Sequence, residues 1–437
     1  MKRILWFRRD LRVEDNKILS FEGDVLPIFI FDKNILKELQ KDDRRVSFIY
    51  HYVIKLKNEL KLLELDLKIF FDTPQNVFDL LLEQYDFDEV IASGDYDSYA
   101  RQRDIEISQK IHFRYLNETY LFKPKEVLKK DGTPYLVFTP YFKEAMKRLA
   151  EKDLSVSKIA NISLLEFSYE EFPTLESMGF IDQKVPIEDP KEKLKNMKQK
   201  LLAYKTQRNV MNSNVVSHLS KDLRFGTIGI RTVFRELLGC KESYEFIREL
   251  LFREFYAYLL FHFPELEDRN FKYAFNGIWD QNKYDCFVKA QTGVPIVDAG
   301  IRELLSTGYM HNRVRMIVAS FFTKDLLLPW QKGEELFARY LLDYDKASNV
   351  LSWQWSAGTG VDPQPYFRVF NPYLQSKKFD KEGEYIKKYV LELKDVEPKY
   401  LHNEVYLQSS YIQNYPRPIV DHKRAAQLAI ELFKNSI

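Results

Sequence analysis

The first part of the chain alternates short apolar runs with longer amphipathic stretches. Short apolar runs bounded by polar residues are typical of buried strands. They occur at residues 4–7, 25–31, 67–71 and 90–93. Apolar residues at helical spacing fill the gaps and predict helices at residues 48–65, 74–85 and 98–111. Such alternation predicts an α/β domain with a Rossmann-like, mostly parallel sheet, which binds ligands at the carboxyl ends of its strands.

The rest of the chain has a different pattern. Residues 150–195 lose regular spacing and contain three prolines, which is typical of a surface connector. From residue 194 onward the apolar spacing is almost wholly helical, with polar loops at residues 270–284 and 358–372. The sequence therefore predicts three parts. They are an α/β domain at residues 1–131, a connector at 132–193 and an all-α domain at 194–437.

Charge and cysteine content narrow the classes of function. The 437 residues include 66 Lys and Arg and 64 Asp and Glu, so the net charge is +2 and any basic surface must be local. The two cysteines, Cys240 and Cys286, exclude a disulfide framework and a cysteine-based metal cluster, and they fit a reducing compartment. No apolar run approaches the length of a membrane span. We expect a cytoplasmic protein without membrane contact.

Several enzyme classes lack their motifs in this sequence. No G-x-G-x-x-G follows the first strand, and neither a G-x-S-x-G nucleophile elbow nor a P-loop occurs. The seven histidines form no H-E-x-x-H or H-x-x-x-H pair. We therefore expect no bound metal, no serine hydrolase and no P-loop enzyme.

The candidate chemistry lies in the C-terminal half. Four of the five tryptophans fall there, namely Trp279, Trp330, Trp353 and Trp355. Any one of them is most simply a core aromatic, but four together indicate more than packing. Asn312, Arg315 and Met316 share one helical face by their spacing, which predicts a pocket wall. A second mixed face consists of Glu249, Phe252, Arg253 and Tyr256. The alternative for the second face is a surface ion pair between Glu249 and Arg253, worth a few tenths of a kcal/mol.

Longer motifs identify the sequence as similar to the DNA photolyases and cryptochromes, and most closely to the class I cyclobutane pyrimidine dimer photolyases. The likeness spans nearly the whole chain. It is carried by WFRRDLRVEDN at residues 6–16, GTPYLVFTPYF at 132–142, LSKDLRFG at 219–226, TGVPIVDAGIRELLSTGYMHNRVRMIVASFFTKDLLLPW at 292–330 and WQWSAGTGVDPQPYFRVFNP at 353–372.

The resemblance implies an antenna-binding α/β domain and an all-α domain that encloses a U-shaped FAD beneath a DNA-binding cavity. The implied flavin contacts are Tyr204, Ser217, Leu219, Ser220, Arg253, Asn312, Arg315, Asp343, Asp345 and Asn349. Hydroxyls and backbone N–H groups at a helix start can bind pyrophosphate, and Arg315 can pair with Asp343 beside the isoalloxazine. Asn349 is expected to face flavin N5, where a neutral amide tolerates a reduced anionic flavin.

The implied activity is light-driven repair of cyclobutane pyrimidine dimers, a carbon–carbon lyase reaction. Excited reduced FAD donates an electron to a dimer flipped out of the duplex. Glu249, Asn312, Met316 and Trp355 are implied to line the dimer cavity, with Glu249 bound to a thymine edge and Trp355 as a flat apolar wall. No histidine follows Asn312, as six-four photolyases would require, so the cyclobutane dimer is the expected substrate.

Trp353, Trp330 and Trp279 match the family's electron-transfer chain, which photoreduces FAD. The alignment of Trp279 needs a gap, and packing remains its alternative. Three positions that are usually tryptophan are Phe246, Phe252 and Tyr309 here, which predicts weaker stacking on the dimer.

DNA is expected to meet a local positive rim. The implied DNA contacts are Arg208, Phe252, Arg313, Arg368 and Lys377, with Lys378 beside it, and ordinary solvated side chains are the alternative for the two lysines. An antenna chromophore is implied, either a folate such as methenyltetrahydrofolate or a deazaflavin or flavin. Asp97, in GDYDSYARQRD, favours a folate, but a helix-start role accounts for it equally well.

The partner expected from this resemblance is UV-damaged DNA, bound by a monomer without an obligate protein partner. A cryptochrome-type blue-light photoreceptor and a six-four photolyase are the alternatives. The absence of a long C-terminal extension, together with Asn349, Glu249 and Met316, favours repair.

Overall fold

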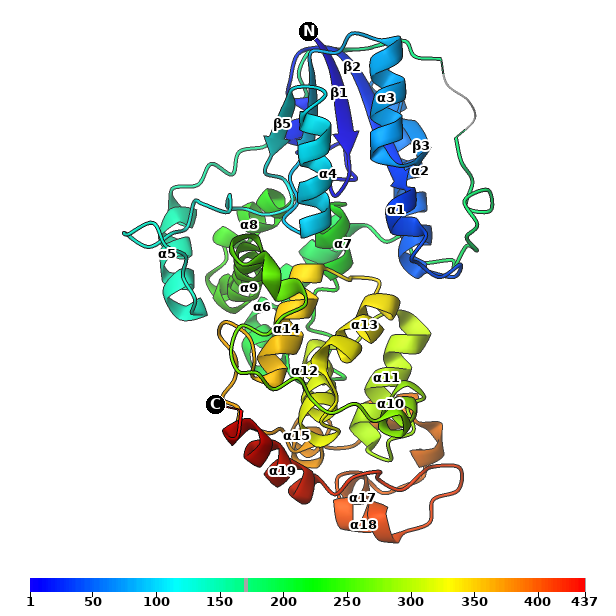
Figure 1. Cartoon of the computed structure of the whole chain (residues 1–437), viewed down its shortest axis with the longest axis vertical. Helices are drawn as coiled ribbons and strands as arrows, with labels where there is room; N and C mark the ends of the chain where they lie inside the picture. The colour runs from blue at the N-terminus through cyan, green and yellow to red at the C-terminus, as the bar shows by residue number, and fades with distance from the viewer. Residues whose placement is uncertain (169–171, 437) are drawn as a thin grey trace. The chain divides into compact units, whose positions relative to one another are not determined.

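The computed structural model describes residues 1–168 and 172–436 (Figure 1). It contains two compact units. Unit 1 comprises Met1–Tyr135, Thr139–Gln199 and Ser217–Pro264, and unit 2 comprises Leu136–Phe138, Lys200–Val216 and Glu265–Ile437. Residues 217–264, predicted as part of the helical domain, therefore cluster with the α/β part. The functional boundaries at residues 131 and 193 stay a prediction.

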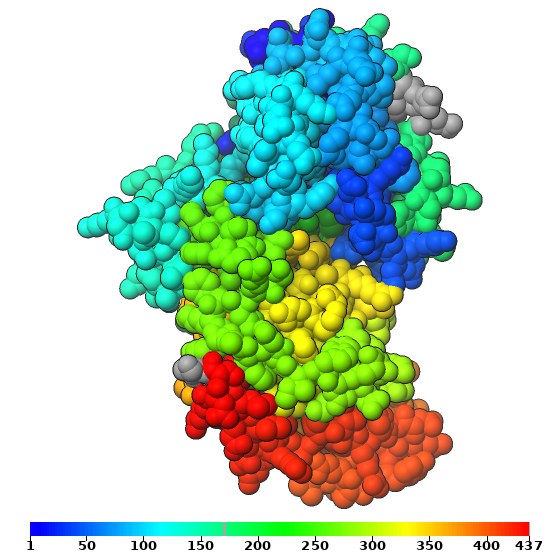
Figure 2. All heavy atoms as spheres, viewed as in Figure 1, coloured from blue at the N-terminus to red at the C-terminus, as the bar shows by residue number. Residues whose placement is uncertain are grey.

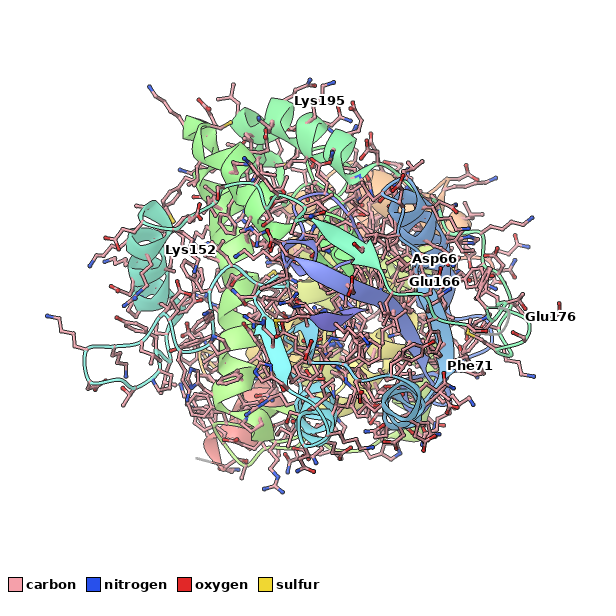
Figure 3. All side chains as sticks on the ribbon, turned by 90° about the horizontal axis from the view of Figure 1, so that it is seen from above. Asp66, Phe71, Lys152, Glu166, Glu176 and Lys195 are labelled. Atoms are coloured by element: carbon pink, nitrogen blue, oxygen red, sulfur yellow. The ribbon has the colours of Figure 1, made fainter. Side chains whose placement is uncertain are left out.

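Unit 1 is built on a parallel sheet, as predicted. Its strand order is β3-β2-β1-β4-β5, and β6 pairs with the start of β2. The strands are β1 (Lys2–Phe7), β2 (Gly23–Asp32), β3 (Lys68–Asp72), β4 (Glu89–Ser93), β5 (Phe113–Leu116) and β6 (Ile162–Leu164). Figure 3 looks onto this sheet from above, with Phe71 on β3 and with Glu166 just beyond β6. The strand β6 lies within the predicted connector, which the sequence pattern did not reveal.

Helices follow the strands of unit 1. They are α1 (Lys33–Leu36), α2 (Arg44–Lys61), α3 (Pro74–Gln84), α4 (Ser98–Ser108), α5 (Phe138–Ala150), α6 (Pro190–Gln207), α7 (Ser220–Phe225), α8 (Ile230–Leu238) and α9 (Tyr244–His262), of which α5 and α6 have residues in both units. Trp6 of β1 packs edge-on against Phe78 of α3, with ring centroids 5.2 Å apart. The core of this face includes buried residues of α3 and α4, so these helices cover one side of the sheet.

Unit 2 is almost wholly helical. Its helices are α10 (Gln281–Val288), α11 (Pro295–Thr307), α12 (Asn312–Ser320), the π-helix η4 (Phe321–Asp325), α13 (Trp330–Tyr340), α14 (Lys346–Ala357), α15 (Pro372–Phe379), α16 (Glu384–Tyr389), α17 (Pro398–Leu401), α18 (Glu404–Ser409) and α19 (His422–Lys434). Short 3-10 turns are η1 (Lys17–Leu19), η2 (Lys241–Ser243), η3 (Pro264–Glu267) and η5 (Leu391–Leu393).

Close packing fixes α12, α13 and α14 against one another. Gly333 of α13 allows this approach, because a Cβ built there would lie 2.2 Å from the Trp353 ring of α14. The π-helix η4 continues α12 directly, and α19, red in Figure 2, packs against it. His422 of α19 holds η4 through Asp325, with Nδ1 and Oδ1 2.5 Å apart. None of the described helices is long and apolar enough to cross a membrane.

Candidate functional site

Asn349 lies buried on α14, where its side-chain amide is held by an acid from α13. Asp345 caps α14 by accepting from the Ser348 N–H at 3.1 Å. One turn later, Asn349 Nδ2 donates to Glu334 Oε1 at 2.9 Å and to the Glu334 carbonyl at 3.3 Å. Burial raises the pKa of Glu334, which also accepts from the Tyr344 hydroxyl. The amide donors of Asn349 are thus committed, which leaves Oδ1 to accept a hydrogen bond from a ligand.

Arg315 of α12 pairs with Asp343, the residue pair expected from the sequence. Arg315 Nη2 lies 2.9 Å from Asp343 Oδ2, and Nε donates to the Met310 carbonyl at 2.8 Å. Burial alone would lower the pKa of Arg315, but the Asp343 carboxylate outweighs it and raises that pKa. The pair therefore stays ionised and holds α12 to the segment that leads into α14.

The predicted wall of Asn312, Arg315 and Met316 is a helical face of α12. His311 caps this helix, because its Nδ1 accepts from the Arg313 N–H at 3.2 Å. Asn312 is exposed, whereas Arg315 and Met316 are half-buried. An amide, a guanidinium and a thioether thus stand on one side of a helix whose other side is core.

The second predicted face lies on α9 of unit 1. Arg253 donates to the carbonyls of Thr119 at 2.9 Å and Leu223 at 3.1 Å. These two hydrogen bonds, and not an ion pair with Glu249, therefore fix the Arg253 side chain. Glu249 is half-buried, with Arg248 Nη1 3.8 Å from its Oε1. The Arg253 guanidinium thus ties α9 to the loop at Thr119 and to helix α7.

Ser217, Leu219 and Ser220 lie at the start of α7, as predicted for a phosphate-binding segment. Ser217 Oγ accepts from the Leu219 N–H at 3.3 Å. Leu219 is the N-cap residue, and no side chain caps the helix. Backbone N–H groups without a side-chain cap, together with two hydroxyls, suit an anionic group.

The three tryptophans predicted for electron transfer lie in different environments. Trp353 is 1% exposed, and within the described residues its Nε1 has no hydrogen-bond partner. Trp330 is also buried but donates from Nε1 to Asn270 Oδ1 at 2.7 Å. Trp279 is 47% exposed. Exposure therefore increases from the first tryptophan of the predicted chain to the last.

The remaining predicted residues of unit 2 lie in two places. Trp355 is half-buried on α14, with Phe370 6.5 Å away between ring centroids. Tyr204 is buried on α6, and Arg208 lies 5.8 Å from its ring centroid.

Of the predicted DNA contacts, Arg313 links two elements. It donates to Asn209 Oδ1 at 2.8 Å, beside Arg208, and its guanidinium lies 4.7 Å from the Phe379 ring of α15. The other basic candidates, Arg368, Lys377 and Lys378, are exposed, whereas Phe252 of α9 is half-buried. The structure thus brings Arg208, Arg313 and the end of α15 together within unit 2.

Asp97 of unit 1 caps α4. Its carboxylate accepts from the Ala100 N–H at 2.8 Å, which is the helix-start role weighed for it from the sequence.

Among residues 1–168 and 172–436, no group of three or more metal-ligating side chains is found.

Sequence reasoning missed three residues next to the predicted site. Glu334 follows Trp330 by one helical turn, and that spacing places it near Trp330 but does not indicate Asn349 as its partner. Lys324 is fully buried in η4. The sequence signal that could have revealed it is a single lysine within an otherwise apolar segment. Tyr284 lies beside Trp279 with ring centroids 5.0 Å apart. The sequence predicted a polar loop at residues 270–284, but α10 begins at Gln281 and includes Tyr284, so the end of that prediction was wrong.

Comparisons with known proteins agree with the resemblance. A family model described as DNA photolyase matches residues 3–158, and one described as the FAD binding domain of DNA photolyase matches residues 246–435. The chain is 34% identical to the deoxyribodipyrimidine photo-lyase of Alkalihalophilus pseudofirmus, over 99% of this chain and 98% of that relative.

Solved structures give the same picture. A bacterial class III photolyase from Agrobacterium tumefaciens is 30% identical with a TM-score of 0.87, covering 100% of this chain and 97% of that one. An archaeal photolyase from Sulfolobus tokodaii, solved with two FAD molecules, is 30% identical with a TM-score of 0.85 and full coverage of both chains at 100%. Assignment to class I stays a prediction.

Proposed function

The chain belongs to the DNA photolyase family, and from that membership we propose that it is a deoxyribodipyrimidine photo-lyase that repairs cyclobutane pyrimidine dimers with blue light. Relatives with this name match nearly its whole length. The observation that carries the proposal is the buried Asn349 amide, whose donors are committed to Glu334. A neutral acceptor in a buried place suits a reduced flavin, which must give up an electron and take it back.

The cofactor is FAD, and the described residues fit it. The start of α7 offers backbone N–H groups to a pyrophosphate, while Asn349, Arg315 and Asp343 offer an acceptor and a fixed ion pair to an isoalloxazine. When bound, reduced FAD supplies the electron that opens the cyclobutane ring after absorbing blue light. The other proposed contacts are Tyr204, Ser217, Leu219, Ser220, Arg253, Asn312 and Asp345.

We assign the lesion to Glu249, Asn312, Met316 and Trp355. Glu249 hydrogen-bonds a thymine edge and so fixes the orientation of the base. Asn312 supplies an amide for the second base, while Met316 and Trp355 supply apolar surfaces that exclude water. Phe252, also on α9, stacks more weakly than the indole it replaces, because its ring is smaller.

The tryptophans provide a path by which the flavin is reduced. A hole on Trp353 has no nearby acceptor for the indole proton, since Nε1 has no hydrogen-bond partner among the described residues. The hole therefore stays charged in a buried place and moves toward Trp330 and then to the exposed Trp279, where water stabilises it.

DNA contacts the protein through phosphates at Arg208, Arg313, Arg368 and Lys377, while the lesion itself specifies the site. UV-damaged DNA is the partner, and we propose that the protein acts as a cytoplasmic monomer, because repair of one lesion needs one active site.

An antenna chromophore, either a folate or a deazaflavin, is proposed for unit 1, where ligands are expected at the carboxyl ends of the strands.

The proposal is tested with an oligonucleotide that carries a thymine dimer. The photoreduced holoprotein should restore the ultraviolet absorbance of the thymine double bonds in blue light and not in the dark. In Glu249→Gln we expect about tenfold slower repair, the loss of one hydrogen bond to a charged group. Glu242→Gln, an exposed acid just before α9, is the matched control and should repair normally.

Failure of repair has a specific meaning if the bound FAD still photoreduces. The protein would then be a photoreceptor, or it would act on six-four photoproducts, and the same assay with a six-four oligonucleotide separates the two.

A further inference from the structure

Tyr284 lies between the exposed and the buried ends of the tryptophan series in unit 2. Its ring centroid is 5.0 Å from that of Trp279 and 6.4 Å from that of Phe322. Phe322 in turn lies 5.5 Å from Trp353. Among the described residues, Tyr284 is the one aromatic side chain in ring contact with Trp279, and its phenol is half-buried.

Backbone contacts fix this neighbourhood. The Ile278 N–H donates to the Leu327 carbonyl at 2.7 Å. Gly277, with φ of +75°, lets the chain pass so close that a Cβ there would lie 2.6 Å from Pro329 N. On the other side, Asp280 caps α10 by accepting from the Lys283 N–H at 3.1 Å. The backbone that carries Trp279 and Tyr284 is therefore fixed on either side of the Asp280 cap.

The chemistry of the two rings differs at this contact. A hole on Trp279 is an indole radical cation, which carries a charge at a half-exposed position. A phenol that loses an electron also loses its proton, so the product is a neutral radical with no charge to solvate. Burial, together with the negative charge of Glu335, raises the pKa of Tyr284, so the phenol keeps its proton until it is oxidised.

On the premise of the proposed function, we propose that Tyr284 is the terminal electron donor of the photoreduction path. The Trp279 radical cation takes one electron from Tyr284 and becomes neutral tryptophan. Tyr284 becomes a neutral tyrosyl radical, and its hydroxyl proton passes to water. The oxidant that creates the hole is photoexcited oxidised flavin, and an added thiol later returns an electron and a proton to Tyr284. The electron on the flavin then has no tryptophan radical cation to which it can return.

The test uses the oxidised holoprotein and a laser flash, with transient absorption and electron paramagnetic resonance as readouts. In the wild type, a tyrosyl radical signal should grow as the tryptophan radical decays. Tyr284→Phe should lose the tyrosyl signal and shorten the lifetime of the separated radicals, while its ring keeps the packing. Tyr400→Phe is the matched control, because Tyr400 is a half-exposed tyrosine of unit 2 that stacks on Tyr406 at 4.2 Å.

Three results would overturn the proposal: a tyrosyl signal that persists in Tyr284→Phe, an equal tryptophan radical lifetime in both proteins, or no tryptophan radical in the wild type. The proposed function is tested separately by repair with the chemically reduced wild type, which needs no photoreduction. Loss of that repair with intact radical signals would refute the lyase and support the role of Tyr284.

Discussion

At the scale of single residues, the chemistry depends on polar groups that the fold buries and leaves partly unsatisfied. Asn349, Trp353 and Lys324 are each nearly inaccessible to solvent. The Asn349 amide donates its hydrogen bonds to Glu334. Trp353 Nε1 and Lys324 Nζ have no hydrogen-bond partner within the described residues. Burying such groups costs free energy, which proteins accept mainly where function needs them.

Asn349→Asp places a second carboxyl beside Glu334, whose pKa burial already raises. Once both carboxyl groups are ionised, the pair carries one more negative charge than in the wild type, and that charge disfavours a reduced anionic flavin. We expect the pKa of the reduced flavin to rise by about one unit or more. Absorption spectra of the photoreduced protein across pH measure it. Glu334→Gln is the control and should shift that pKa in the opposite direction, because it removes the neighbouring acid.

Lys324 makes stability depend on pH. Burial lowers its pKa from 10.5 to about 7, and its Nζ lies 3.6 Å from the Phe433 ring. Between pH 7 and 10.5 the unfolded chain binds a proton that the folded chain does not, so the free energy of unfolding rises with pH across this window. Below about pH 7 both states are protonated, and the full cost of the buried charge remains.

Lys324→Met should therefore raise the free energy of unfolding by about 1–4 kcal/mol at pH 6, and the gain should shrink toward pH 10. Urea unfolding at several pH values measures this difference. Lys423→Met, at an exposed position of α19, is the control and should change little. An equal gain at every pH would show that the charge of Lys324 is not the cause.

At the scale of elements, the sequence predicts what local pattern determines. The strands β1 to β4 were predicted because each contains a short, mostly apolar run, and α3 because its apolar residues recur at helical spacing. Strand β5 has exposed residues in its middle, and β6 has three residues, so neither shows a strand pattern. Both are stabilised by pairing with a neighbouring strand, which the local sequence does not encode.

The candidate site was predictable in part for the same reason. The face of Asn312, Arg315 and Met316 follows from helical spacing alone. The contact of Asn349 with Glu334 joins residues 15 apart on two helices, and the contact of Arg313 with Asn209 spans 104 residues. Such contacts depend on how helices pack, which periodicity does not specify.

Asp97 allows the capping of α4 to be tested apart from any antenna role. Asp97→Ala removes the acceptor of the Ala100 N–H and should destabilise the protein by about 1 kcal/mol. Asp97→Asn keeps an acceptor oxygen and should leave stability nearly unchanged. Urea unfolding compares the two variants. If an antenna needs the carboxylate, both variants lose chromophore from the purified protein, whereas a purely structural role leaves its content unchanged in Asp97→Asn.

At the scale of the whole molecule, a chain with net charge +2 must still bind a polyanion. Its 66 basic and 64 acidic residues nearly cancel, so long-range attraction is weak and affinity depends on where the cations lie. Many arginines are already paired with acids inside unit 1, as with Arg8 and Asp104 at 2.6 Å. The exposed Arg368 and Lys377 of unit 2 remain available for phosphates.

Lys377→Ala therefore provides a test of the proposed DNA rim. Each phosphate contact releases counterions, so the logarithm of the binding constant falls with the logarithm of salt concentration in proportion to the number of contacts. Loss of one contact should reduce that slope by about one, equally for DNA with and without the dimer. Fluorescence anisotropy with labelled oligonucleotides at several salt concentrations measures it. Lys423→Ala, an exposed lysine of α19, should leave the slope unchanged. If Lys377→Ala instead weakened binding only to dimer-containing DNA, Lys377 would recognise the lesion and not the backbone.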